Sequence, residues 1–243
     1  IVFPYHADEI EAVSKAIENC GRPIVLSLSP GPAFIGNPKH LRENANLWRI
    51  SGDFWDKWYA LKRQLELCRD WAPLVTEGHW PDADMLPLGR LNIRTELRDH
   101  PERWTNFNHD ESYFLMTLWS IFRSPLMFGG NMPQNDAFTL SLLTNSEVIR
   151  VNQHTENNKE ISNDEGISIW TADDTDGSKK YMAVLNINDF PERVTLPLEE
   201  AGMESKTIKN LWTSTELPVT SNAFTIEIPA HGAGLFSVET VHN

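Results

Sequence analysis

The sequence predicts an α/β part followed by an all-β part. Up to about residue 155, short apolar runs that end in Gly, Pro, Asp or Asn alternate with segments of helical periodicity. Such alternation is typical of a parallel sheet covered by helices. From residue 166 onward, short runs rich in Val, Ile, Thr and aromatic residues alternate with turn clusters, and helical periodicity is lost. We therefore expect one domain at 1–155 and a second at 156–243.

The first half contains four strand–loop–helix units preceded by a helix. That first helix is predicted at 9–20, with Asp8 and Glu11 as a capping pair and Gly21 as its end. Consecutive units of this kind connect parallel strands, so their helices lie outside the sheet. The predicted strands cover 24–28, 46–50, 84–88 and 125–128. The predicted helices cover 53–72, 111–123, 136–144 and 146–151.

The second half is interpreted as an antiparallel β-sandwich of about eighty residues, a normal size for a domain. Its apolar runs are too short for helices and are separated by turn residues at regular intervals. The predicted strands cover 166–171, 180–188, 192–196, 207–212, 223–228 and 233–238.

Composition excludes several functional classes. The 243 residues include 21 Lys and Arg against 34 Asp and Glu, and the net charge of −13 repels phosphate backbones and anionic membranes. No apolar run is long enough to span a membrane. Cys20 and Cys68 have no second Cys or His at ligand spacing, so neither a zinc site nor a disulfide is expected. We predict no metal, no cofactor and no nucleic-acid partner.

Two segments, 48–56 and 78–85, combine carboxylates with aromatic rings and tight turns where apolar runs end. Aromatic faces cover the apolar side of a pyranose, while carboxylates and Arg bind hydroxyls or transfer protons. Five of the nine Trp residues lie in or between these two segments. A glycosidase is therefore our first hypothesis.

A simpler interpretation of the same residues stays open. Asp53 is also well placed to cap a helix that begins at Phe54, and Asp82 and Asp84 suit a turn next to a proline. Calcium binding by Asp82 and Asp84 is weaker still, because no further ligand and no glycine lie at loop spacing.

Four motifs, in order, resemble glycoside hydrolase family 27, the melibiase or α-galactosidase family. They are WRISGD at 48–53, GHWPDADML at 78–86, WSIFRSPL at 119–126 and LTNSEVI at 143–149. The resemblance implies a (β/α)8 TIM barrel of which this chain supplies strands five to eight, with the β-sandwich appended. In such barrels the chemistry lies at the carboxyl ends of the strands. It also implies a secreted or periplasmic location, which the sequence itself does not fix.

By motif match, the resemblance implies that Asp53 is the general acid/base of a retaining, exo-acting α-galactosidase, with Arg49 beside it. Asp84 and Met85 would contact the sugar, and further substrate-binding positions are assigned less directly. These are Trp48, Trp80, Asp82 and Ser29. Ser29 stands where galactosidases typically place an acidic residue and an aromatic one, so α-N-acetylgalactosaminidase specificity is an alternative.

The resemblance also implies a gap. In the family the nucleophile is an aspartate at the end of barrel strand four, a segment that would lie before Ile1. We therefore expect the isolated chain to be inactive and to pair with the missing N-terminal half or with a second copy. The alternatives are a non-catalytic carbohydrate-binding protein and a structural half-barrel whose motifs serve only packing and capping.

Overall fold

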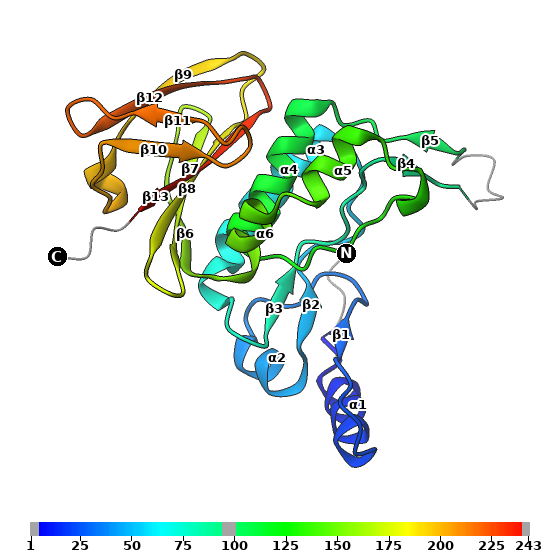
Figure 1. Ribbon diagram of the computed structural model, residues 1–243. Coiled ribbons are helices and arrows are strands. Elements are labelled where there is room, and N and C mark those ends of the chain that lie inside the picture. The colour runs from blue at the N-terminus through cyan, green and yellow to red at the C-terminus, as the bar shows by residue number, and fades with distance from the viewer. Residues whose placement is uncertain (1–4, 94–100, 240–243) are drawn as a thin grey trace.

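A computed structural model describes residues 5–93 and 101–239 and has the predicted order, an α/β part followed by a β-rich part (Figure 1). Three strands form a parallel sheet in the order β1-β2-β3: β1 Ser27–Leu28, β2 Leu47–Arg49 and β3 Trp80–Asp82. The helices are α1 Ala7–Asn19, α2 Pro38–Asn44, α3 Trp58–Trp71, α4 His109–Phe122, α5 Ala137–Leu143 and α6 Ser146–Gln153. A short hairpin, β4 Arg90–Leu91 with β5 Arg103–Trp104, projects from this part (Figure 1).

Two predicted strands of the first half are wrong. The sheet strand lies at Trp80–Asp82 instead of 84–88, and 125–128 contributes only an isolated parallel bridge from Phe128 to Leu86. Residues 86–88 of this apolar run are buried by packing, but the backbone turns away from the ladder at Asp84, whose φ is +78°. An apolar run therefore indicated burial here without indicating a strand.

Helix α3 begins at Trp58, so the predicted start at Asp53 is also wrong. The Phe54 N–H donates to the Asp84 carboxylate at 2.7 Å, not to a cap from Asp53. The buried Asp56 carboxylate accepts bonds from Arg103 of β5 and so ties the segment before α3 to the β4–β5 hairpin. The capping pair predicted for α1 is absent too, because His6 occupies the cap without a side-chain bond.

The β-rich part is a six-stranded antiparallel sheet with a two-stranded sheet packed on one face. The order of the larger sheet is β11-β10-β13-β8-β7-β6, and β9 pairs with β12 in the smaller one. The bounds are β6 Thr155–Asp164, β7 Ile167–Asp174, β8 Lys179–Asn186, β9 Glu192–Pro197, β10 Thr207–Asn210, β11 Glu216–Pro218, β12 Ala223–Ile228 and β13 Ala233–Glu239. Sequence reasoning missed β6, whose residues TENNKEISND lack an apolar alternation.

Helix α4 joins the two parts. Every side chain from Phe114 to Phe122 is buried, and the helix packs between α3 and α6 on one side and β8 and β13 on the other. Along β8 the side chains alternate between two cores: Ala183 and Leu185 face α4, whereas Met182 and Val184 face the β9–β12 sheet. The large sheet is therefore covered on both faces.

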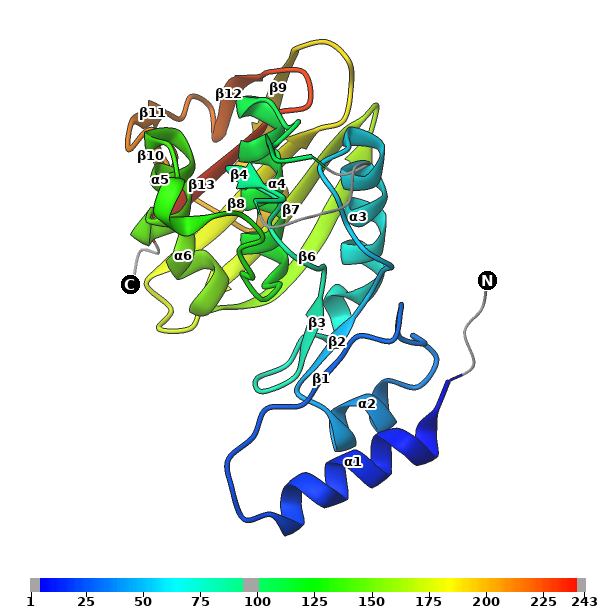
Figure 2. The same ribbon diagram turned by 90° about the vertical axis from the view of Figure 1, so that its right-hand side faces the viewer.

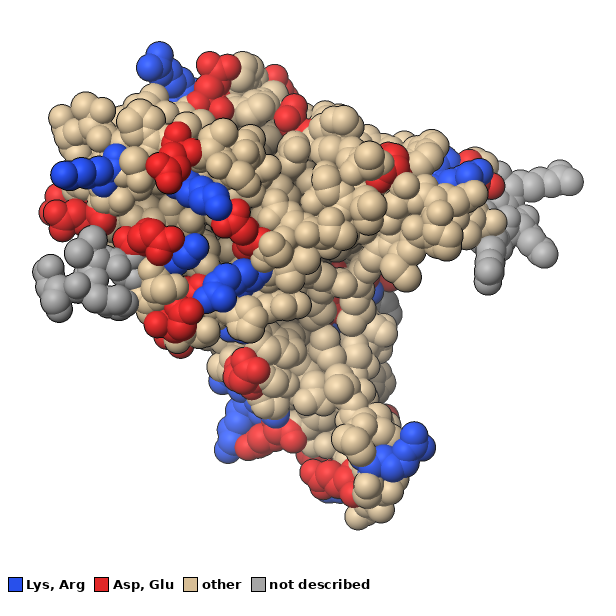
Figure 3. All heavy atoms as spheres, in the orientation of Figure 1, with Lys and Arg blue, Asp and Glu red and all other residues tan. Residues whose placement is uncertain are grey.

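The β1–β3 sheet and helices α1 and α2 form a lobe that extends away from the β-rich part (Figure 2). In Figure 3 this lobe narrows below the body, and acidic and basic side chains are interspersed on the face shown. Among the described residues, no helix has both the length and the apolar character needed to cross a membrane.

An ion pair between the half-exposed Arg150 and the buried Asp174 carboxylate fastens α6 to the sheet. Arg150 donates to both carboxylate oxygens of Asp174 at 2.7 and 2.8 Å, and Tyr181 donates to the same carboxylate at 2.7 Å. The Asp174 side chain has no exposed surface. Removing one partner of such a pair leaves a charge that water cannot solvate.

We predict that Arg150→Met destabilises the chain by about 3 kcal/mol, because the buried Asp174 carboxylate loses its cation. The matched control is Lys209→Met, which breaks the half-exposed pair between Lys209 and Glu147 of the same helix and should cost less than about 1 kcal/mol. Urea unfolding monitored by tryptophan fluorescence measures both losses. Equal losses would contradict the role given to burial.

Candidate functional site

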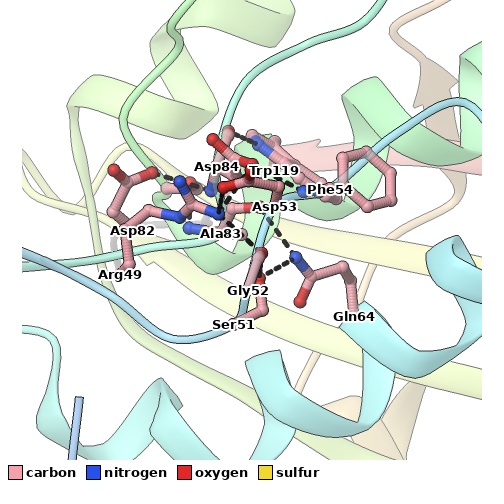
Figure 4. A network of polar contacts seen from close by, with 11 residues as sticks. Arg49, Ser51, Gly52, Asp53, Phe54, Gln64, Asp82, Ala83, Asp84 and Trp119 are labelled. Carbon is pink, nitrogen blue, oxygen red and sulfur yellow. Dashed lines mark hydrogen bonds and ion pairs between the residues drawn. The ribbon is translucent and has the colours of Figure 1, made fainter. Parts of the chain in front are cut away.

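Asp53, Arg49 and Asp84 come together at the carboxyl end of the parallel sheet (Figure 4). Arg49 is the last residue of β2, and Asp84 follows the end of β3. One Arg49 nitrogen, Nη2, lies 2.7 Å from Asp84 Oδ2 and 3.6 Å from Asp53 Oδ1, and it donates to the Gly52 carbonyl at 2.5 Å. Parallel strands end at one edge of a sheet, which is why residues thirty positions apart meet here.

The three side chains differ in exposure. Arg49 and Asp84 are 11% and 14% exposed, whereas Asp53 is 86% exposed. The buried pair compensates its own charges, and Asp84 accepts a further bond from the Phe54 N–H. The arrangement therefore provides a fixed cation and a fixed carboxylate, with a second, accessible carboxylate beside them. Such a set can bind hydroxyl groups and transfer a proton.

Asp84 is held in an unusual backbone conformation by side chains. Its φ of +78° lies in the left-handed region, which is costly for a residue with a Cβ. Its N–H donates to Asp82 Oδ1 at 2.8 Å, and its carbonyl accepts from the Trp119 indole at 2.9 Å. The preceding Ala83 N–H donates to Ser124 Oγ at 3.0 Å. These bonds replace the strand ladder and aim the Asp84 carboxylate at Arg49.

Asp82 supports Asp84 and is itself only 3% exposed. Burial raises the pKa of Asp82 above 3.8, the usual value for an aspartate, while the Asp84 N–H and the Arg49 charge oppose the rise. Asp82 was predicted to contact substrate. In this structure its carboxylate instead accepts a bond from the neighbouring Asp84 N–H.

The two tryptophans predicted for the pocket wall lie elsewhere. Trp48 is fully buried, with its ring 6.3 Å from that of Trp71, because side chains alternate along β2 and Arg49 takes the face toward Asp84. Trp80 is the first residue of β3 and so lies at the amino end of the sheet, where the Arg123 guanidinium stacks 4.6 Å from its ring centre. The prediction that Trp48 and Trp80 line the substrate pocket is therefore wrong. Residues that are adjacent in a sequence can face opposite sides of a sheet or lie at opposite ends of it.

Met85 and Ser29 lie near the same edge of the sheet. Met85 is half-buried, and its sulfur lies over Gly129, where an added Cβ would be 2.6 Å away. Ser29 is exposed directly after β1, in a loop that is tied to β2 by the Ala33 N–H bond to the Arg49 carbonyl at 2.8 Å. No contact joins Ser29 to Asp53 or Asp84 among the bonds found in the described residues.

Sequence reasoning missed Trp119, Ser124 and Gln64. The first two belong to the motif at 119–126, which was noted only as a resemblance. Gln64 lies on α3, is 2% exposed, and donates to Ser51 Oγ at 2.8 Å and to the Ala83 carbonyl at 2.9 Å. A signal was present, since this polar residue interrupts the buried stripe formed by Leu61, Leu65 and Cys68. Within the described ranges, no cluster of three metal-ligating side chains occurs.

Comparisons with known proteins agree on one family. The model of the family described as Alpha galactosidase A matches residues 5–154, and that of the Alpha galactosidase C-terminal beta sandwich domain matches residues 164–238. A GH27 β-L-arabinopyranosidase from Geobacillus stearothermophilus, solved with arabinose, is 42% identical with a TM-score of 0.92 and covers 98% of this chain and 55% of its own.

Curated relatives are more distant. Alpha-galactosidase D of Emericella nidulans is 30% identical over 205 residues, which are 82% of this chain and 29% of the relative. Alpha-galactosidase 2 of Arabidopsis thaliana is 26% identical, over 93% of this chain and 54% of the relative. The chain thus spans 29% to 54% of the length of these relatives.

We predict that Asp82→Asn raises the melting temperature at neutral pH. A raised pKa in the folded state means that ionised Asp82 destabilises the fold, fully above that pKa and progressively less as the pH falls toward 3.8. Asparagine keeps an oxygen for the Asp84 N–H and carries no charge. Thermal melts at several pH values measure the difference, which should shrink as the solution becomes acidic. Asp82→Ala, which removes the acceptor as well, is the matched comparison and should be less stable than Asp82→Asn at neutral pH.

Proposed function

Since the chain belongs to the Alpha galactosidase A family, glycoside hydrolase family 27, we propose that it is part of a retaining, exo-acting glycosidase that removes terminal α-linked galactose or a related sugar. The observation that carries the proposal is the single Arg49 nitrogen shared by Asp53 and Asp84. A glycosidase needs a carboxylic acid that reaches the departing oxygen and fixed polar groups that hold the sugar.

In this proposal Asp53 is the general acid and later the general base. Its high exposure leaves it free to reach a glycosidic oxygen, and Arg49 Nη2 lies 3.6 Å from its Oδ1 atom. Arg49 and Asp84 bind sugar hydroxyls, with Met85 and Ser29 beside them. Asp82 contributes through Asp84, to whose N–H it is bonded.

The nucleophile is proposed to lie outside residues 1–243. A retaining enzyme needs a second carboxylate about 5 Å from the acid, aimed at the anomeric carbon. Asp84 is already engaged by Arg49 and the Phe54 N–H, and Asp82 is buried. Neither is available to attack. This supports the interpretation of residues 1–155 as strands five to eight of a (β/α)8 barrel, with 156–243 as the appended sandwich.

The free edge of β1 supports the same view. β1 pairs only with β2 in the described sheet, so one side of its backbone has no strand beside it. Next to it lies a mostly apolar cleft of about 350 Å³, lined by Leu26 and Leu28 together with side chains of α1. Phe34 at its rim is 56% exposed. An exposed strand edge beside apolar surface normally has a partner.

Two sugars of one shape are candidates for the substrate. A β-L-arabinopyranoside has the ring configuration of an α-D-galactopyranoside and lacks only its hydroxymethyl group. The 42% identity to a β-L-arabinopyranosidase favours including both sugars in any assay. The ratio of kcat/KM for the two sugars then measures how much the hydroxymethyl group contributes to binding of the transition state.

We predict that Asp53→Asn lowers kcat/KM about 100-fold or more for disaccharide substrates and less than about tenfold for dinitrophenyl glycosides, which need little protonation on departure. The measurement uses the shortest form of the protein that hydrolyses an aryl glycoside, either this chain or a longer polypeptide that contains it. Asp70→Asn, at a half-exposed carboxylate on α3, is the matched control and should change neither rate. Equal losses on both substrate types would rule out Asp53 as the acid.

We also predict that the purified 243-residue chain shows no turnover of aryl α-galactosides and is not a monodisperse monomer, because the β1 edge stays uncovered. Size-exclusion chromatography with light scattering and a chromogenic assay test the two parts. A stable and active monomer would overturn the half-barrel proposal, since the nucleophile would then lie within these residues.

A further inference from the structure

Gln64 is a buried amide that touches both segments of the candidate site without belonging to either. Its Nε2 group uses its two hydrogens separately, one on Ser51 Oγ at 2.8 Å and the other on the Ala83 carbonyl at 2.9 Å (Figure 4). Ser51 lies in the turn that carries Asp53, and Ala83 immediately precedes Asp84. One NH2 group on α3 therefore bridges the two chain segments.

The orientation of this amide is fixed by chemistry. The Ala83 carbonyl can only accept a bond, so the NH2 side of Gln64 must face it. The Gln64 Oε1 atom is buried and has no hydrogen-bond partner among the described residues. An unpaired buried oxygen is costly, so the two donated bonds must outweigh that loss. The Gln64 amide is thus held in place by the bonds of its NH2 group to the two site segments, and its own oxygen contributes no bond.

Gln64 is also rigidly mounted. It stands on α3 between Leu61 and Leu65, whose side chains are 0% and 2% exposed within the main core. A side chain anchored in this way sets the positions of whatever it bonds to, since its own rotamer is restricted by packing. The bond to Ala83 fixes the peptide unit that precedes the left-handed Asp84, and the bond to Ser51 fixes the turn after Arg49.

We propose that Gln64 is a positioning residue for the reaction proposed above: it sets the distance between the Asp53 turn and the Asp84 carboxylate without contacting substrate. The inference rests on the proposed function, because it concerns the geometry of that acid. Arg49 Nη2 lies within 3.6 Å of Asp53 and 2.7 Å of Asp84, so a shift of either segment breaks the shared contact. A displacement of about 1 Å at such a site can lower a rate by two orders of magnitude.

The first test compares Gln64→Met, Gln64→Glu and Leu65→Val in the shortest form of the protein that hydrolyses an aryl galactoside. Gln64→Met keeps the length and loses both donors, so we expect kcat/KM to fall about tenfold or more. Leu65→Val shortens a core side chain of the same helix by one methylene group and calibrates a purely structural loss. It should lower the melting temperature and leave kcat/KM unchanged at temperatures where the protein is fully folded.

Gln64→Glu separates positioning from packing by its pH dependence. An ionised carboxylate cannot donate to Ser51 or to the Ala83 carbonyl, whereas a protonated one donates a single bond. The activity of this variant relative to the unmodified protein should therefore rise as the pH falls. The ratio for Leu65→Val should stay flat over the same range. A flat ratio for Gln64→Glu, or a loss in Gln64→Met no larger than in Leu65→Val, would overturn the proposal.

A second readout does not depend on turnover. Amide chemical shifts of Phe54, Ala83 and Asp84, measured by nitrogen-15 NMR, should move in Gln64→Met and stay in place in Leu65→Val. Unmoved shifts would overturn the proposal even if activity fell. If the unmodified protein hydrolysed neither galactosides nor arabinopyranosides, the proposed function would fail, while the shifts would still decide whether Gln64 holds the two segments together.

Discussion

The fold depends on an α4 helix that has no polar face to turn toward water. From Phe114 to Phe122 each side chain is buried, so the helix is stable only if other elements cover it on every side. Helices α3 and α6 cover one side and strands β8 and β13 the other. The α/β part and the β-rich part therefore share one hydrophobic core, and neither can leave the other without exposing α4.

This shared core explains how the candidate site is held. Trp119 lies within the buried stretch of α4, and its indole reaches the Asp84 carbonyl, while Ser124, just after the helix, binds the Ala83 N–H. Gln64 approaches from α3. A loop whose backbone groups are bound by side chains of rigid helices can hold a residue at φ +78°, a conformation that a free loop would relax. The rigid helices α3 and α4 thus maintain the strained backbone conformation of Asp84.

Much of the secondary structure follows from local pattern. Strand β12 occupies Ala223–Ile228, the predicted range, because its alternation is regular and its ends carry turn residues. Strand β6 was missed because ten mostly polar residues pair with β7 through backbone bonds that no side-chain pattern announces. The opposite error occurred at 84–88, where an apolar run is buried without forming a ladder.

The sequence by itself determined the α/β class of the first part and the order of the two parts, and its motifs named Asp53, Arg49 and Asp84 as one site. The strand predicted at 84–88 would place Asp84 at an amino end, and only the observed strand Trp80–Asp82 brings it to the edge that the carboxyl ends of parallel strands share. Only the tertiary structure decided which neighbours face that edge. Trp48 points into the core and Trp80 lies at the far end of the sheet, although both adjoin the motifs. Facing is set by strand register and by packing between distant segments, and neither is encoded in the spacing of adjacent residues.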